Sequence, residues 1–306
     1  MKLLTLLFLS ILFVPTTYAA VHIDDHRAAE ILKQAREAIG GEQRLQKLEA
    51  LHINGQYRRV FGERQMAGDR EISIALPNRY LVEDSMNPGG LSTAMLNTRG
   101  LNGERAWSGS SGGGGGMVFR FGGPGGAQLT PEQMEAGLRR IYQAEFTRYL
   151  LAVTLAPPAS LAVEYKYAGE SDVDGEPADV VDVTGPENFS VRLFFDKKNH
   201  LPLLLSYRGP KPRVVTMSRP AGAAAPKPED LKKARDEAEQ KLHAQAPMTP
   251  PEEVDFYIRL SDHKKVDGLM LPFKFTFLTE SEVSEEFEIS KYQVNPQFKA
   301  DKFEKH

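Results

Sequence analysis

The feature that most constrains this chain is an alternation of apolar and polar residues that begins near residue 50. In the first such segment Leu51, Ile53 and Tyr57 lie at odd positions. Successive side chains of a β-strand point to opposite faces, so a period of two predicts half-buried strands. Pairs such as Asn102-Gly103 and Asp267-Gly268 stand between segments of this kind and are typical of tight hairpins. The alternation therefore predicts an antiparallel meander.

Two segments have helical spacing instead. One follows Asp24 and Asp25, which can cap a helix, and it ends at Gly40-Gly41. The other begins at Thr130 with a capping residue, a proline at the first helical position and a glutamine placed to bond back. Its apolar residues keep helical spacing until Pro157. The sequence thus predicts two amphipathic helices beside the sheet.

The first residues have the pattern of an export signal. Lys2 precedes an apolar run over residues 3–14, and Thr17-Tyr18-Ala19 is a small-residue cleavage site. We expect residues 1–19 to be removed as a signal peptide, with cleavage after Ala19 or Ala20, and the mature protein to be soluble in the periplasm or another extracytoplasmic compartment. The chain has no cysteine, which excludes disulfides, thiol nucleophiles and a lipid-modified cysteine.

Composition divides the rest of the chain. Residues 109–127 are rich in glycine and are expected to form a loop, and residues 209–251 are rich in proline, alanine and charge and are expected to be an exposed insertion. We expect residues 20–298 to form a single domain carrying both insertions, followed by a charged tail over residues 299–306. With 38 basic and 41 acidic residues the net charge is -3, so we expect no nucleic-acid partner.

No motif commits the chain to a reaction. The pattern at 109–113 matches the G-x-S-x-G elbow of hydrolases around Ser111, but no helix follows until Thr130. His22 would become the third mature residue after cleavage at Ala19 and could then bind copper or nickel, although a polar N-terminal arm explains the same residues. The glutamates of residues 280–288 are interpreted as a solvated face. We expect a non-enzymatic protein without metal or cofactor.

The apolar strand faces are the most suggestive candidates for a binding site. Alternate residues of several strands offer large apolar surfaces to one interior, which either forms an ordinary core or holds an apolar ligand. The residues predicted to line a ligand site are Ile72, Ile74, Leu203, Leu205, Phe256, Ile258, Phe273, Phe275 and Phe277.

The order of these features resembles the LolA/LolB-like periplasmic lipoprotein-carrier superfamily. The resemblance covers residues 23–108, 130–208 and 253–298. The features that carry it are the signal peptide, the helix ending at Gly40-Gly41, the Leu51 to Tyr57 strand, Pro77-Asn78-Arg79-Tyr80, the hairpin ending at Trp107, the mid-chain helix, Phe195-Asp196 to Leu201-Pro202, and Gly268 to Pro272-Phe273 followed by Asn295 and Phe298.

This resemblance implies an α+β fold. The expected architecture is an antiparallel, strongly curved incomplete β-barrel, a half-barrel meander of about ten strands, with amphipathic helices closing the concave face. It also implies a carrier or sensor that holds the acyl chains of a lipid or an acylated protein, with transient contact with a membrane surface. A charged residue at position 275 should then abolish loading without loss of secondary structure.

Two other functions stay open at this stage. The chain could be an interaction module with a closed core, in which residues 109–127 or 209–251 contact another envelope protein. It could also be an exported hydrolase, a hypothesis that depends on Ser111 alone.

Overall fold

The computed structural model describes residues 25–61, 64–86, 95–111, 130–211 and 252–305. The predicted signal peptide and His22 lie outside these residues, as do most of the two predicted insertions. Within the described residues, no helix is long and apolar enough to cross a membrane.

The described residues form one antiparallel sheet of twelve strands rather than about ten. The strands are β1 (Ala50–Phe61), β2 (Arg64–Ala75), β3 (Arg79–Met86), β4 (Met95–Asn102), β5 (Arg105–Ser111), β6 (Glu164–Val173), β7 (Glu176–Thr184), β8 (Ser190–Asp196), β9 (Pro202–Pro210), β10 (Glu253–Val266), β11 (Leu269–Thr279) and β12 (Glu282–Val294).

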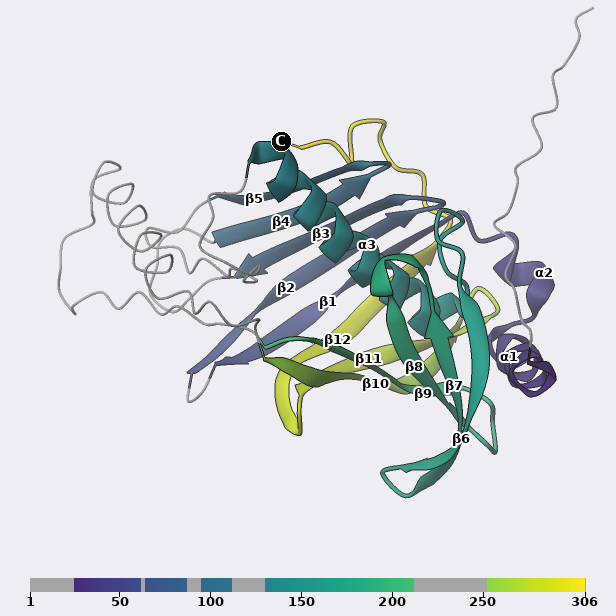
Figure 1. Cartoon of the computed structure of the whole chain (residues 1–306). Helices are drawn as coiled ribbons and strands as arrows, with labels where there is room; N and C mark the ends of the chain where they lie inside the picture. Colours follow the sequence, from purple (N-terminus) through teal and green to yellow (C-terminus); the bar gives the residue numbers. More distant parts are fainter. Residues whose placement is uncertain (1–24, 62–63, 87–94, 112–129, 212–251, 306) are drawn as a thin grey trace, which may run out of the picture.

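The strand order places the first and the last strand of the chain side by side. The order is β5-β4-β3-β2-β1-β12-β11-β10-β9-β8-β7-β6, so β1 pairs with β12 in the middle and β5 and β6 form the two edges. Helix α3 (Pro131–Thr154) connects these edges and contacts β4, β5 and β9. The sheet curves around it, so that α3 lies along the concave face (Figure 1).

The predicted start of each long helix is confirmed at the atomic level. Asp25 caps α1 (His26–Ile39), because its Oδ1 accepts bonds from the backbone nitrogens of Arg27 at 2.9 Å and Ala28 at 3.3 Å. Thr130 and Gln133 form a reciprocal capping box at α3. A single turn, α2 (Glu42–Leu45), follows α1, and a 3-10 turn, η1 (Pro186–Asn188), precedes β8.

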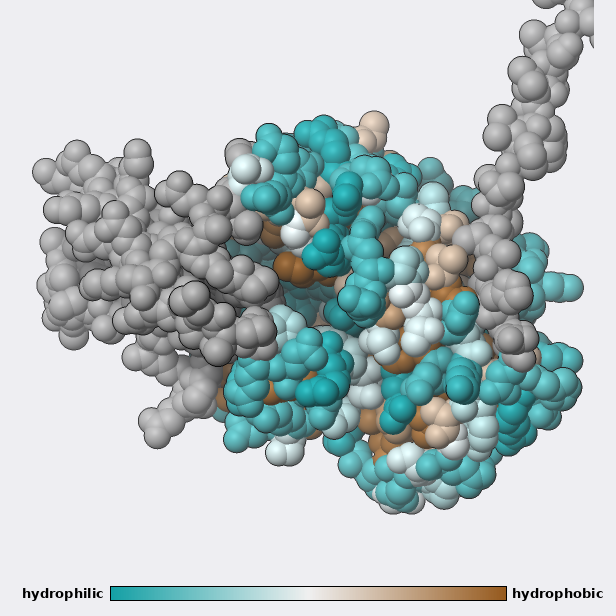
Figure 2. Space-filling view, viewed as in Figure 1, coloured by the Kyte–Doolittle hydropathy of each residue, from teal (hydrophilic) through white to brown (hydrophobic). Residues whose placement is uncertain are grey.

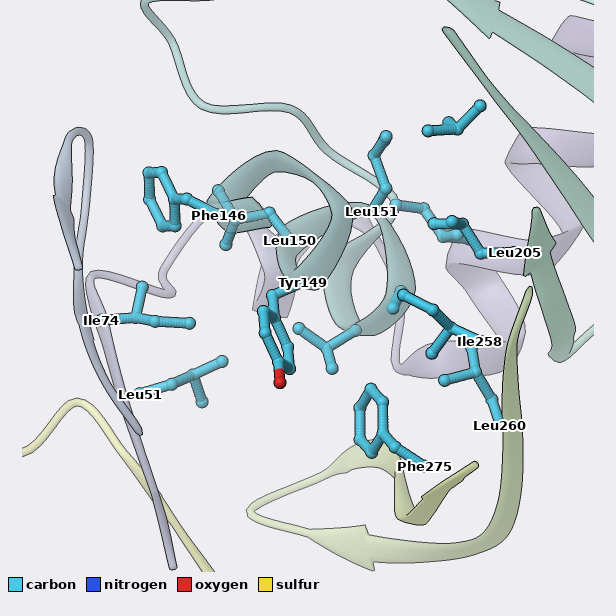
Figure 3. Packing of buried hydrophobic residues seen from close by; sticks show 14 of the residues in the cluster. Leu51, Ile74, Phe146, Tyr149, Leu150, Leu151, Leu205, Ile258, Leu260 and Phe275 are labelled. Atoms are coloured by element: carbon cyan, nitrogen blue, oxygen red, sulfur yellow. The ribbon is translucent and has the colours of Figure 1, made fainter. Parts of the chain in front are cut away.

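The second half of α3 differs from the amphipathic helix predicted for it. Residues 149–153 are all buried, because strands from both halves of the curved sheet surround this part of the helix. Figure 3 shows Tyr149 pointing between Leu51 and Phe275, while Leu151 lies toward Leu205 on another side. The first half is more accessible, with Met134 44% exposed. Helix α3 is therefore anchored at its C-terminal half.

Three predicted segment boundaries need correction, one of them because β9 runs to Pro210, inside the insertion predicted over residues 209–251. Strand β5 continues through Ser111, since Ser110 pairs with Asn97 and Ser111 with Leu96, so residues 109–111 belong to the sheet and not to a loop. The predicted charged tail also packs on the protein. Phe303 is 1% exposed and lies with Ala75 and Leu81 in a small cluster on the convex face.

Candidate functional site

A row of residues in register crosses the concave face near the β1–β2 and β11–β12 turns. Each residue of the row pairs directly with the next one on the neighbouring strand, from β2 through β1, β12, β11 and β10 to β9. Directly paired residues point to the same face of a sheet, so all these side chains lie on one face. The row consists of Met66, Arg59, Glu285, Phe277, Ile258 and Leu205. On this side of the molecule Figure 2 shows a hollow between α3 and the strands β10 to β12, with hydrophobic residues in it.

The predicted lining residues divide into two groups. Five of them pack in the core with exposures of 0% to 7%: Ile72, Ile74, Leu205, Ile258 and Phe275. Four are only partly buried: Leu203, Phe256, Phe273 and Phe277.

Not all of the partly buried residues lie together. Phe277 is in the row with Ile258, and Phe256 stacks on Tyr207 with ring centroids 5.1 Å apart. Phe273 lies toward the other end of β11, where its ring meets that of Tyr292 at 5.2 Å. The concave face therefore offers partly accessible apolar side chains mainly beside Phe277 and Tyr207.

A buried ion pair that the sequence analysis missed lies at the centre of the same face. Arg70 is 1% exposed and Asp84 is 2% exposed. The Arg70 Nε donates to Asp84 Oδ1 at 2.6 Å and its Nη2 donates to Oδ2 at 2.9 Å, which makes the pair bidentate. The same guanidinium also donates to Glu285 of β12.

This pair is the centre of a network that reaches α3. Arg59 Nε donates to Glu285 at 2.6 Å. Arg99 lies between Asp84 at 3.2 Å and the α3 residue Glu145 at 2.8 Å, and the Tyr80 hydroxyl donates to Glu145 at 3.0 Å. We call this set the central ion network; it comprises Arg59, Arg70, Asp84, Arg99, Glu145 and Glu285. It attaches the middle of α3 to the sheet by polar contacts.

The electrostatics of the network favour the charged forms. Burial opposes ionisation of Asp84 and Glu285, but Arg70 and the neighbouring arginines outweigh it and lower the pKa of both carboxyls. Burial also raises the pKa of Tyr57 to about 12. The Tyr57 hydroxyl lies in this interior without a hydrogen-bond partner among the described residues, and the Arg70 guanidinium is 4.7 Å from its ring centroid.

We expect stability to fall in acid because of this network. A carboxyl whose pKa is lower in the folded state stabilises the fold fully above its unfolded pKa, here near 3.8 for Asp84 and 4.5 for Glu285, and loses that contribution as the pH falls toward the folded value. Urea unfolding between about pH 7 and about pH 3 should therefore show a falling free energy of unfolding. An Asp84→Asn variant should show a shallower fall, and an unchanged slope would contradict this assignment.

The site has no evident hydrolytic chemistry. Ser111 lies within β5 and not at a strand-to-helix turn, so the geometry of a nucleophile elbow is missing there. Each carboxylate of the central ion network is paired with an arginine. In the part of the chain that the structure describes, no group of three or more His, Asp or Glu side chains could hold a metal ion.

No family model and no curated protein matches the chain. Among solved structures, it is similar to a LolA superfamily protein from Nitrosomonas europaea, with 12% identity over 91% of this chain and 97% of that chain and a TM-score of 0.43. It is also similar to a DUF1329 family protein from Desulfovibrio piger, with 12% identity, 90% and 97% coverage and a TM-score of 0.45.

A third similar structure is described as an outer membrane lipoprotein-sorting protein domain from Vibrio parahaemolyticus, with 8% identity, 91% and 96% coverage and a TM-score of 0.44. The first and third of these names belong to the superfamily that the sequence resembles. What the concave face of this chain binds is argued below from its own residues.

Proposed function

We propose that this chain is an exported, non-enzymatic carrier or sensor that holds the acyl chain of a lipid or an acylated protein on the concave face of its sheet. The observation that carries the proposal is the hollow beside α3 (Figure 2), on the face where Met66, Phe277 and Tyr207 pack against the core and remain partly exposed. Burying an acyl chain there contributes about 0.8 kcal/mol per CH₂ group.

Helix α3 is placed to control access to this hollow. Its C-terminal half is surrounded by the core, whereas its first half has exposed apolar residues such as Met134 and Ile141. The Arg99 and Glu145 side chains, which tie the middle of the helix to the sheet, are 22% and 24% exposed. Water can hydrate these two groups if they separate, so lifting the first half of α3 costs less than breaking a fully buried pair.

We also propose a single domain over residues 20–298, with residues 1–19 as the export signal and with transient contact with a membrane surface during loading. In this arrangement the helix moves and the sheet stays intact, because Arg70, Asp84 and Glu285 all lie on strands. The buried part of the central ion network would thus remain paired in both states.

An interaction module with a closed core is the second candidate. The observation that favours it is the near-complete burial of Ile72, Ile74, Leu205, Ile258 and Phe275 in the same core as α3. Such a protein would capture another envelope protein through residues 109–127 or 209–251. Deletion of residues 212–251, which lie outside the described residues, separates the two functions. A carrier should still load lipid after this deletion, whereas a module that uses the segment should lose its partner.

Replacing Phe277 with glutamine tests the proposed wall of the hollow. The change replaces a partly buried aromatic ring with a polar side chain. We expect the affinity for a fluorescent fatty acid to fall at least about tenfold, because burying such an apolar side chain against the ligand contributes roughly 1.5–3 kcal/mol. Fluorescence titration of the mature protein measures the effect, and circular dichroism checks that the fold persists.

Val283→Gln is the matched control. Val283 pairs with Leu278, next to Phe277, and is 40% exposed, and the alternation along β11 puts this pair on the convex face. We expect its titration curve to equal that of the wild type. If the Phe277→Gln variant binds the fatty acid as tightly as the wild type, or if both variants lose the same amount of affinity, this surface is excluded as the acyl site.

A further inference from the structure

One cation beside the concave face, Arg148, lacks an ion-pair partner among the described residues. Arg148 lies on α3, with its guanidinium carbon 3.6 Å from the centroid of the Tyr207 ring. Its Nε is buried and has no hydrogen-bond acceptor, and among the described residues the side chain forms no ion pair with a carboxylate. A buried polar group without a partner is costly, so this arginine needs an explanation.

The neighbouring carboxylates are bound to other groups, and among the described residues none of them forms an ion pair with Arg148. Glu145, one turn earlier on α3, accepts from Arg99 and from Tyr80. Asp84 and Glu285 are bound by Arg70. Among the described residues, Arg59, Arg70, Arg99 and Arg148 lie on or beside the concave face together with the carboxylates of Asp84, Glu145 and Glu285. Burial lowers the pKa of Arg148, and the neighbouring Tyr207 and Glu145 offset this effect only in part.

The surroundings of Arg148 combine this charge with apolar surface. Tyr207 presents one face to the guanidinium and stacks on Phe256, with the two ring planes only 11° apart. Stacking on an aromatic face satisfies the flat side of a guanidinium but leaves the N–H groups at its edge available. Tyr207 is in the register row next to that of Ile258 and Phe277. The charged edge of the Arg148 guanidinium therefore lies beside the apolar side chains of Tyr207 and Phe277.

We propose that Arg148 binds the oxyanion head group of an amphiphile whose apolar chain lies along Tyr207 and Phe277. This inference rests on the proposed function and narrows its ligand to one that carries a carboxylate or a phosphate next to the chain. A planar guanidinium binds either group through two parallel hydrogen bonds. The head group supplies the missing negative charge and the acceptor for the buried N–H.

The test compares three probes that share one chain: palmitate, hexadecyl phosphate and the uncharged hexadecanol. Each is titrated against the full mature protein, an Arg148→Met variant and an Arg139→Met variant. Methionine keeps an unbranched apolar stem and removes the charge. Arg139 is the control, because it lies on the same helix but its side chain is 37% exposed and is paired with Glu104 at 2.9 Å. Circular dichroism and thermal unfolding confirm that each variant is folded.

We expect wild type and Arg139→Met to bind at least one anionic probe about tenfold or more tightly than hexadecanol, as a charge-assisted hydrogen bond requires. Arg148→Met should lose this preference while its affinity for hexadecanol stays the same. Preference for palmitate alone would identify a carboxylate site, and preference for hexadecyl phosphate alone a phosphate site.

Two results would overturn the inference, and they differ in what they say about the acyl site. Equal binding of all three probes to the wild type rejects the anion site but leaves the carrier in place, and this comparison needs no variant to fold. An anion preference that persists in a folded Arg148→Met variant rejects Arg148 in the same way. Binding of none of the three probes rejects the acyl site together with its head-group site.

Discussion

Replacing Arg70 with alanine is expected to lower the free energy of unfolding by about 3–5 kcal/mol. Arg70 is 1% exposed and binds both Asp84 and Glu285. The substitution leaves two carboxylates buried without their main counter-charge and removes the cation that lies over the Tyr57 ring. The free-energy cost of keeping unpaired carboxylates away from water is larger than the cost of the lost packing. Urea unfolding monitored by circular dichroism measures the change.

Arg192→Ala is the control for this experiment. Arg192 donates to Asp182 at 2.6 Å, but the two side chains are 50% and 35% exposed, so water replaces the lost contact. We expect a change below about 1 kcal/mol for this exposed pair. If Arg70→Ala is no more destabilising than Arg192→Ala, the central ion network does not hold the sheet together as described.

Replacing Phe275 with aspartate is expected to unfold the protein, with a loss of about 4 kcal/mol or more. This expected result differs from the expectation from the sequence that a charge here only abolishes loading. Phe275 is 1% exposed, and its ring lies 5.8 Å from Tyr149 of α3 and 6.4 Å from Phe287. A carboxylate at this position would be buried among aromatic rings. Far-ultraviolet circular dichroism and thermal unfolding of the purified variant measure the loss.

Val283→Asp introduces the same charge at a position of the sheet that is 40% exposed. This variant should unfold at nearly the wild-type temperature. A Phe275→Asp protein that melts close to Val283→Asp would mean that the interior beside Phe275 is open to water. That outcome would restore Phe275 as a lining residue of an open cavity.

The strands were predictable where one face of the sheet is buried. Alternation such as Ile72 and Ile74 on β2 marks the inward face, and hairpin dipeptides such as Asn102-Gly103 mark the turns. The alternation alone could not reveal that β1 pairs with β12, because this pairing joins opposite ends of the chain. It also could not reveal that α3 crosses the interior.

The charged part of the site was not predicted, because the glutamates of residues 280–288 were interpreted as a solvated face, whereas Glu285 is buried and binds Arg70. The sequence nevertheless contains a signal for it. Arg70 continues the inward face of Ile72, and Asp84 continues that of Val82 on the next strand, so opposite charges occupy neighbouring inward positions. Arg148 could not be identified from the sequence, because its lack of a partner depends on how Arg99 and Glu145 pair in three dimensions.

Native mass spectrometry of the mature protein, isolated from the cell envelope without detergent, tests the carrier function most directly. Organic extraction of the same sample identifies any bound molecule. We predict a stoichiometric ligand that carries an acyl chain, lost in the Phe277→Gln variant and retained in Val283→Gln. A mass equal to the bare chain, unchanged after incubation with phospholipid vesicles and with acylated peptides, would contradict an acyl site on the concave face and favour the interaction module.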